Sequence, residues 1–196
     1  MVPVLRLRKP SDSVTSQTVS VTVTPAPLAL VGFPCSGKST VGERLSALLG
    51  CPWIDSDRAI EASSGKTPAQ WILSEGQDFY RRLEQEWINS WQPPERCILS
   101  TGGGLPCYRD NMRVLSRKAS TVYLFADFPV LHERLTRPPP HILARIHGQA
   151  ALQALHQQRH LTYRTANHLV SAEQGPEAIC EEIRKWHVGR VAGQSD

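Results

Sequence analysis

The sequence feature that most restricts the possible fold is the run Gly-Phe-Pro-Cys-Ser-Gly-Lys-Ser at positions 32–39. It matches the phosphate-binding pattern G-x-x-x-x-G-K-[ST] at every specified position, and the glycines of this pattern let backbone N–H groups surround phosphate oxygens. An apolar run precedes the motif and a helical pattern follows it, so a helix N-terminus would point at the bound anion. We therefore predict a nucleoside triphosphate site with Mg²⁺. Its predicted nucleotide contacts are Cys35, Ser36, Gly37, Lys38, Ser39 and Thr40.

Within this loop, two side chains have distinct predicted tasks. Lys38 would neutralise the β- and γ-phosphates, and the Ser39 hydroxyl would bind Mg²⁺.

Apolar runs of strand length alternate with helical patterns along the rest of the chain. Strands are predicted at 28–31, 53–54, 97–100, 121–125 and 169–170. Helices are predicted at 41–49, 59–62, 67–75, 77–91, 109–116, 129–135, 149–164 and 176–186. Such alternation implies a parallel sheet covered on both faces. We predict an α/β doubly wound fold: the three-layer P-loop NTPase fold, similar to nucleoside monophosphate kinases.

The composition excludes several other classes of protein. No stretch reaches the roughly 18 to 20 consecutive apolar residues that a membrane span requires. The 22 Lys and Arg against 18 Asp and Glu give a net charge of +4, and the basic residues are scattered, so neither nucleic acid nor membrane is an expected partner. The five cysteines are odd in number and lack a Cys-x-x-Cys pair, which favours a reducing compartment, the cytoplasm.

The chain divides into one domain with two short ends. Residues 1–26 are Ser- and Thr-rich and are predicted to be a flexible extension, residues 27–190 form the domain, and residues 191–196 form a flexible tail. A plastid transit segment is an alternative for the extension, because it is Ser-rich, carries arginine and holds one acidic residue. Alternating valines also leave an edge strand open there. We expect a monomer.

Two carboxylates follow directly after the second predicted strand. Asp55 and Asp57 are two residues apart, so they share one side of an extended segment. One could face the metal, while the other orients an acceptor hydroxyl and accepts its proton. Ser100, at the end of the third predicted strand, could reach the metal shell. The alternative for the two aspartates is a helix cap, and the sequence leaves it open.

An arginine and a glycine triplet provide a second set of candidates. Arg81 and Glu84 are three residues apart on a predicted helix, where the acid could hold the guanidinium ready to bind a carboxylate; a solvated ion pair is the alternative. Gly102, Gly103 and Gly104 directly follow a buried strand. Three glycines there carry an entropic cost, and close approach of the backbone to a ligand would explain them.

In this order and spacing, the motifs at 32–39, 55–57, 79–84 and 102–104 resemble those of the shikimate kinase family, and the resemblance runs from about residue 28 to 186. That family transfers the γ-phosphoryl group of ATP to the 3-hydroxyl of shikimate with Mg²⁺, in aromatic amino acid and chorismate biosynthesis. The resemblance implies that Asp57 lies near the reacting hydroxyl. It also implies that Glu84 orients Arg81.

The resemblance extends to further residues of the site. An Arg-x-x-x-Tyr segment implies that Arg159 also grips the substrate carboxylate, although a solvated helix face is the alternative. The substrate-binding residues implied are Asp57, Arg81, Gly102, Gly103, Gly104 and Arg159. The implied metal residues are Ser39, Asp55 and Ser100, and the implied catalytic residues are Lys38, Asp57 and Arg137.

The predicted lid departs from the family pattern. Arg137, which would close over the phosphates, is followed by Pro138, Pro139, Pro140 and His141, whereas the family usually has Arg-Pro-Leu-Leu. A triple proline stiffens a segment that must move. Around 171–176 there is no arginine where the family often has one, so no adenine contact is assigned there.

Two other functions are weighed against this prediction. One is a related small-molecule kinase such as a gluconate kinase, which would not need two arginines for a carboxylate. The other is a kinase-like binding or regulatory protein with an impaired lid, which the intact loop and aspartates oppose. His156 and His160 lie one turn apart, but no third metal ligand accompanies them, so a solvated surface is expected.

Overall fold

The computed structural model describes residues 26–192, with side chains up to residue 190. Its core is one sheet of five parallel strands in the order β2-β3-β1-β4-β5. The strands are β1 (Leu28–Val31), β2 (Trp53–Asp55), β3 (Ile98–Ser100), β4 (Ser120–Phe125) and β5 (His168–Ser171). The predicted α/β fold with a parallel sheet is confirmed. The predicted N-terminal extension and C-terminal tail lie almost entirely outside the described residues.

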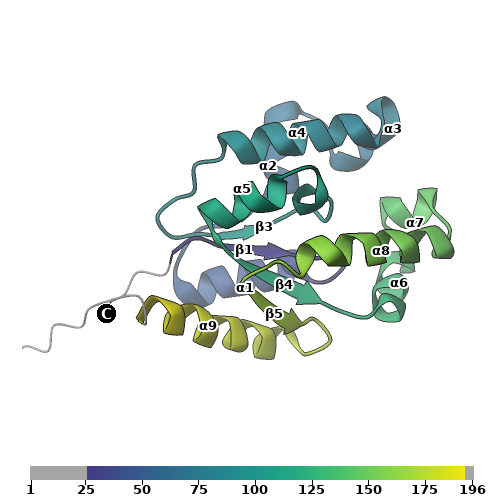
Figure 1. Ribbon diagram of the computed structural model, residues 1–196. Coiled ribbons are helices and arrows are strands. Elements are labelled where there is room, and N and C mark those ends of the chain that lie inside the picture. Colours follow the sequence, from purple (N-terminus) through teal and green to yellow (C-terminus); the bar gives the residue numbers. More distant parts are fainter. Residues whose placement is uncertain (1–25, 193–196) are drawn as a thin grey trace, which may run out of the picture.

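Helices cover both faces of the sheet (Figure 1). Helices α1 and α9 pack together on one face, while α4 and α5 pack together over the other. The helices are α1 (Lys38–Leu49), α2 (Ser56–Ser64), α3 (Pro68–Glu75), α4 (Gln77–Ser90), α5 (Asn111–Lys118), α6 (Phe128–Thr136), α7 (Ile142–Ile146), α8 (Gln149–Tyr163) and α9 (Pro176–Ala192), with a 3₁₀ turn, η1 (Leu105–Cys107). No described helix is long and apolar enough to cross a membrane.

The order of the strands places the phosphate loop after the central strand of the sheet. Strand β1 is fully buried and lies between β3 and β4, with Leu28 opposite both Ile98 and Ser120. Because parallel strands all end at the same edge of the sheet, the loop after β1 lies beside the segments that leave β3 and β4. Ligands of open α/β sheets bind in this crevice beyond the carboxyl ends.

Local contacts explain where the elements differ from the sequence prediction. Helix α2 begins at Ser56, earlier than the predicted start at 59, because the Asp55 carboxylate caps it: Oδ1 accepts hydrogen bonds from the N–H groups of Asp57 (3.0 Å) and Arg58 (3.3 Å). The helix cap, which the sequence analysis left open as the alternative for the two aspartates, is thus present at Asp55. The sequence analysis did not predict η1 or α7, because both are too short for a periodic apolar pattern.

The expectation of a solvated histidine pair on α8 is wrong. His156 is 8% exposed and its ring packs edge-on against Phe33, with ring centroids 5.2 Å apart. His160 Nδ1 is hydrogen-bonded to the Tyr123 hydroxyl at 2.9 Å. Helix α8 packs against the phosphate loop and β4. Aromatic side chains of these segments therefore cover the helix face that carries the two histidines, which the sequence analysis took to be exposed.

Candidate active site

The phosphate loop joins β1 to α1 and has the backbone that its sequence predicts. Cys35 (φ 63°) and Gly37 (φ 92°) adopt left-handed conformations, which suit a concave row of backbone N–H groups. Lys38 Nζ donates hydrogen bonds to the Phe33 carbonyl (2.8 Å) and to Ser36 Oγ (3.4 Å). Burial lowers the pKa of Lys38 to about 8, and Asp57 opposes this shift. An anion bound in the loop would therefore favour the charged form of Lys38.

Two oxygen groups meet at the start of α1, in the arrangement expected for a magnesium site. The Ser39 hydroxyl donates a hydrogen bond to Asp55 Oδ2 at 2.8 Å. Hydroxyl and carboxylate oxygens fit Mg²⁺, which usually takes one or two protein ligands and completes its shell with phosphate oxygens and water. The described part of the chain contains no cluster of three or more His, Cys, Asp or Glu side chains that could hold a metal ion.

Ser100 lies at the end of β3, as predicted, beside the first residue of α1. It is fully buried, donates a hydrogen bond to the Lys38 carbonyl at 2.9 Å and accepts one from Trp53 Nε1 at 3.0 Å. These contacts fix the first turn of α1 against β2 and β3. They give Ser100 a role in positioning the loop, and its place in the outer metal shell stays a prediction.

The acceptor side of the crevice is formed by α2, α4 and the segment after β3. Asp57 Oδ1 accepts a hydrogen bond from the Tyr80 hydroxyl at 2.8 Å. Burial raises the pKa of Asp57, while the Tyr80 hydrogen bond opposes the rise. Burial also raises the pKa of Tyr80, so its hydroxyl remains a donor. Asp57 thus lies between Lys38 of the phosphate loop and the α4 side chains, where an acceptor hydroxyl could meet a bound phosphate.

Arg81 is held by a buried ion pair on α4. Its Nη1 contacts Glu84 Oε2, and the two side chains are 11% and 0% exposed. Burial raises the pKa of Glu84 to about 7, and the Arg81 guanidinium opposes this rise. The pair has the geometry that the motif predicts, and its burial excludes the alternative of a solvated pair.

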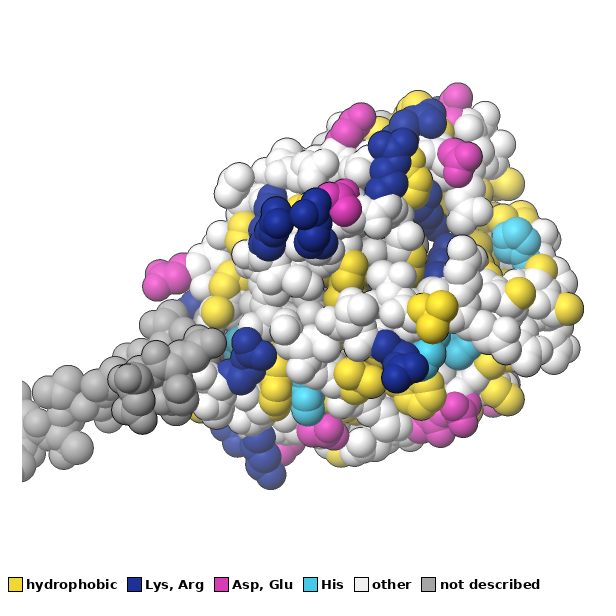
Figure 2. Space-filling view, in the orientation of Figure 1, with side chains coloured by type: hydrophobic (Ala, Val, Ile, Leu, Met, Phe, Trp, Pro, Cys, Tyr) yellow, Lys and Arg dark blue, Asp and Glu magenta, His cyan; other side chains and the backbone are white. Residues whose placement is uncertain are grey.

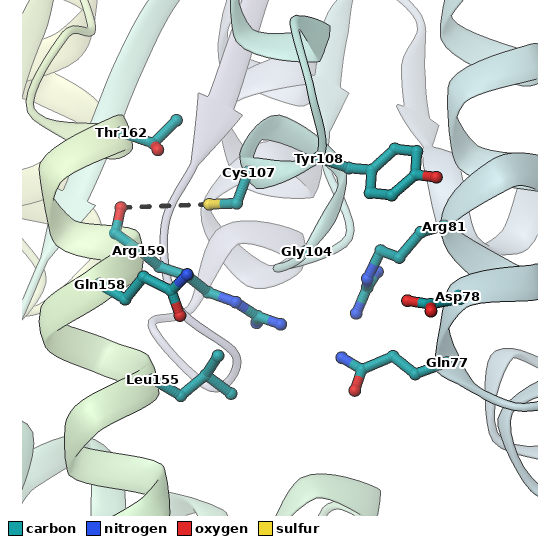
Figure 3. A pocket seen from close by; sticks show the side chains of 10 residues that line it. All are labelled: Gln77, Asp78, Arg81, Gly104, Cys107, Tyr108, Leu155, Gln158, Arg159 and Thr162. Atoms are coloured by element: carbon teal, nitrogen blue, oxygen red, sulfur yellow. Dashed lines mark hydrogen bonds between the residues drawn. The ribbon is translucent and has the colours of Figure 1, made fainter.

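A second arginine reaches the same cavity from the opposite side. In Figure 3, Arg81 from α4 and Arg159 from α8 point toward each other across a cavity of about 290 Å³. Arg159 is 5% exposed, and within residues 26–192 its Nη1 has no hydrogen-bond partner. The mouth is the hollow between α4 and α8 in Figure 2, where dark blue Lys and Arg side chains are visible. Two buried cations facing one cavity favour an anionic ligand between them.

The glycine triplet makes room for these side chains. A Cβ atom at Gly102 would overlap the Asp57 carboxylate, and one at Gly103 would lie 2.6 Å from Pro34 Cδ. A Cβ atom at Gly104 would overlap the Arg81 guanidinium. The predicted reason for the triplet was close approach to a ligand. The structure adds a second reason: the backbone passes directly beside Asp57 and Arg81 and leaves no room for a Cβ atom.

Arg137 lies away from the cavity. Its guanidinium pairs with Glu133 at 2.6 Å, and both side chains are about two-thirds exposed (67% and 68%). Arg134, which the sequence analysis did not select, instead contacts the phosphate loop: it donates hydrogen bonds to the carbonyls of Cys35 (3.5 Å) and Ala172 (3.1 Å). The sequence around Arg134 does not indicate this contact, because it depends on how α6 packs against the phosphate loop.

His141 is a second residue that the sequence analysis did not assign to the site. It lines a second, smaller pocket together with Asp57, and this pocket shares Arg81, Gly104 and Arg159 with the cavity. Burial lowers its pKa to about 4, and the charges of Lys38 and Arg159 add to this effect. Its Nδ1 accepts a hydrogen bond from the Leu143 N–H at 3.1 Å, so the neutral ring carries its proton on Nε2.

Comparison with known proteins identifies the family. Residues 34–187 match the family model described as shikimate kinase. A shikimate kinase from Aquifex aeolicus is 31% identical over 164 residues, which cover 84% of this chain and 97% of that protein. The crystal structure of a shikimate kinase from Acinetobacter baumannii in complex with shikimate has a TM-score of 0.79 and 27% identity, covering 85% of this chain and 95% of that one.

A gluconokinase from Sinorhizobium meliloti has a TM-score of 0.61 and 20% identity, and it covers 88% of this chain and 98% of that one. That likeness shows the shared fold. The match to the family model and the identity to a relative of nearly equal length go further: this chain belongs to the shikimate kinase family.

Proposed function

We propose that this chain transfers the γ-phosphoryl group of ATP to the 3-hydroxyl of shikimate, with Mg²⁺, and that the side chains gathered at the sheet edge carry the steps. The enzyme is a phosphotransferase with an alcohol group as acceptor, in chorismate biosynthesis. The observation that supports the acceptor best is the pair of buried, opposed guanidinium groups beside the phosphate loop. A carboxylate between them would relieve their repulsion and accept hydrogen bonds from both.

In this proposal, the nucleotide binds along the phosphate loop. The backbone N–H groups from Cys35 to Thr40 hold the phosphates, and Lys38 neutralises the charge that develops as the γ-phosphoryl group moves. Ser39 would hold Mg²⁺ directly, and Asp55, hydrogen-bonded to it, would belong to the outer metal shell. The bound Mg²⁺ supplies further charge neutralisation on the phosphate oxygens.

On the acceptor side, Arg81 and Arg159 bind the shikimate carboxylate and so orient the ring. Gly102, Gly103 and Gly104 let the backbone lie beside the substrate and the side chains that bind it. Asp57 receives the proton of the 3-hydroxyl as the oxygen attacks the γ-phosphorus. The site as a whole works mainly by positioning and by fixed charge, as phosphoryl transfer requires.

One assay tests the proposed function directly. ADP release is measured with ATP, Mg²⁺ and shikimate, and gluconate replaces shikimate in the control. Turnover with shikimate alone is the expected result. Turnover with gluconate alone would indicate the related sugar-acid kinase. No turnover with either acceptor would favour a kinase-like binding protein, although Lys38, Asp55 and Asp57 are all in place.

Gly104 offers a test of the acceptor site that leaves every polar group intact. We expect Gly104→Ala to raise the KM for shikimate by about tenfold or more, because the new methyl group would displace the Arg81 guanidinium. The KM for ATP should hardly change. Gly189→Ala on α9 is the matched control, since a Cβ there meets no atom within 4 Å. An unaltered KM for shikimate in Gly104→Ala would contradict the place given to Arg81.

Arg137 is proposed to reach the phosphates by closure of the segment that follows α6. We expect Arg137→Ala to lower kcat by roughly tenfold or more, because the positive charge would be lost from the transition state. The melting temperature should stay within about 1 °C of wild type, because exposed ion pairs such as Arg137–Glu133 contribute little to stability. If kcat is unchanged, Arg134, which already contacts the loop, takes over this role.

We also propose that the enzyme acts in the cytoplasm as a monomer. All five cysteines are free thiols, which suits a reducing compartment.

A further inference from the structure

The proposed mechanism does not use the hydroxyl group of Tyr80. The Tyr80 side chain is 2% exposed and lies on α4, directly before Arg81. Its hydroxyl donates a hydrogen bond to Asp57 Oδ1 at 2.8 Å. Tyr80, Asp57 and Arg81 line the smaller pocket that shares residues with the cavity. A phenylalanine ring would fill the same space, so packing alone does not explain why this buried side chain carries a hydroxyl group.

The surroundings of Asp57 give that reason. Oδ1 lies between the Tyr80 hydroxyl and the Gly102 backbone, where a Cβ atom would overlap it. Among the hydrogen bonds of the described residues, the Asp57 carboxylate accepts the one from Tyr80, at Oδ1, and its second oxygen, Oδ2, accepts none. The terminal torsion of an aspartate is broad and poorly fixed by its own rotamer preference. One anchored oxygen and one open oxygen therefore give the carboxylate a single orientation toward the cavity.

We propose that Tyr80 is a positioning residue: its hydroxyl fixes Asp57 Oδ1 so that Oδ2 is presented to the hydroxyl of the acceptor. The proposal rests on the proposed function, because it assigns Asp57 to the acceptor hydroxyl. A misplacement of about 1 Å in a reacting group can cost about a hundredfold in rate. Loss of the Tyr80 hydroxyl should therefore lower kcat and leave substrate binding, which Arg81 and Arg159 provide, unchanged.

The test is Tyr80→Phe, which removes one oxygen atom and keeps the ring. We expect kcat to fall about ten- to a hundredfold, the usual range for losing a hydrogen bond to a charged group. The KM for shikimate and the KM for ATP should each stay within about threefold of wild type. Binding of ATP, measured by titration calorimetry, should be unchanged.

The matched control is Tyr123→Phe. Tyr123 is equally buried, at 1% exposed, and its hydroxyl is also hydrogen-bonded, to His160 Nδ1, but it lies on β4 away from Asp57. Both variants should lose similar stability, which thermal unfolding measures, and only Tyr80→Phe should lose kcat.

Four outcomes would overturn the proposal. Equal loss of kcat in both variants would mean a general structural effect. A raised KM for shikimate with unchanged kcat would make the hydroxyl a binding contact, and unchanged kinetics would leave it no role. If Tyr80→Phe does not fold, Tyr80→His replaces it, because histidine keeps a ring N–H donor. The proposal is also refuted if Tyr80→His has a normal kcat while its crystal structure shows that the histidine does not hydrogen-bond Asp57. If the wild-type enzyme shows no turnover with shikimate, the proposed function itself fails.

Discussion

Asp57→Asn should lower kcat for shikimate phosphorylation by about a thousandfold while ATP still binds with wild-type affinity. The amide has the shape of the carboxylate, and its Oδ1 can still accept the hydrogen bond from Tyr80. What is lost is the negative charge and the basic oxygen that would receive the proton of the acceptor hydroxyl. Steady-state ADP release gives kcat, and titration calorimetry gives the ATP affinity.

Asp110→Asn is the matched control for this experiment. Asp110 precedes α5 and forms an exposed ion pair with Arg113, so the same chemical change there should leave kcat unaltered. If Asp57→Asn retains kcat within about threefold of wild type, Asp57 is not the group that handles the proton. The hydroxyl would then be activated by the phosphates alone.

Arg81→Ala should reduce kcat/KM for shikimate by roughly a hundred- to a thousandfold, equivalent to about 3–4 kcal/mol. Two effects combine in this loss. The substrate carboxylate loses one of its two guanidinium partners, and Glu84, which is fully buried, is left without its ion pair. Burial already raises the pKa of Glu84 to about 7, and Arg81 opposes this rise. Without Arg81, the Glu84 carboxyl should therefore be protonated, and the site loses its negative charge as well.

Nucleotide binding separates a substrate effect from a folding effect in Arg81→Ala. ATP affinity should be unchanged, because Arg81 lies on the acceptor side of the crevice. Arg82→Ala is the control: Arg82 is exposed and stacks on the Phe79 ring at 5.5 Å. Arg81→Lys should fall between wild type and alanine, since lysine keeps the charge but lacks the planar fork. An unaltered kcat/KM in Arg81→Ala would refute the acceptor assignment.

Residues whose task depends on neighbours in the chain could be predicted from the sequence. Lys38 and Ser39 stand at fixed positions in a loop whose geometry the motif itself imposes, and the structure shows that geometry. Arg81 and Glu84 pair across one turn of α4, as their spacing predicts. In both cases, the partners are held by the same short segment, so local backbone geometry suffices.

Several contacts between segments that lie far apart in the chain were not predicted. Arg134 contacts a loop 99 residues earlier in the chain, and His156 is buried against Phe33 of that same loop. The Ser100 hydroxyl donates a hydrogen bond to the Lys38 carbonyl, 62 residues earlier in the chain, a contact that the sequence analysis did not predict. Arg137, predicted to close over the phosphates, pairs with Glu133 at the surface, whereas Arg134 contacts the phosphate loop. No local pattern distinguishes Arg134, on α6, from Arg137, which follows that helix.

By itself, therefore, the sequence determined the fold class and the phosphate loop, because alternating strands and helices and a glycine-rich turn are properties of short segments. Only the tertiary structure decided how the acceptor cavity is built. It brings Arg81 and Arg159 face to face from α4 and α8, and it places Tyr80 on Asp57 from another helix. Such contacts follow from how the helices pack around the sheet edge, and packing depends on side chains that lie far apart in the chain.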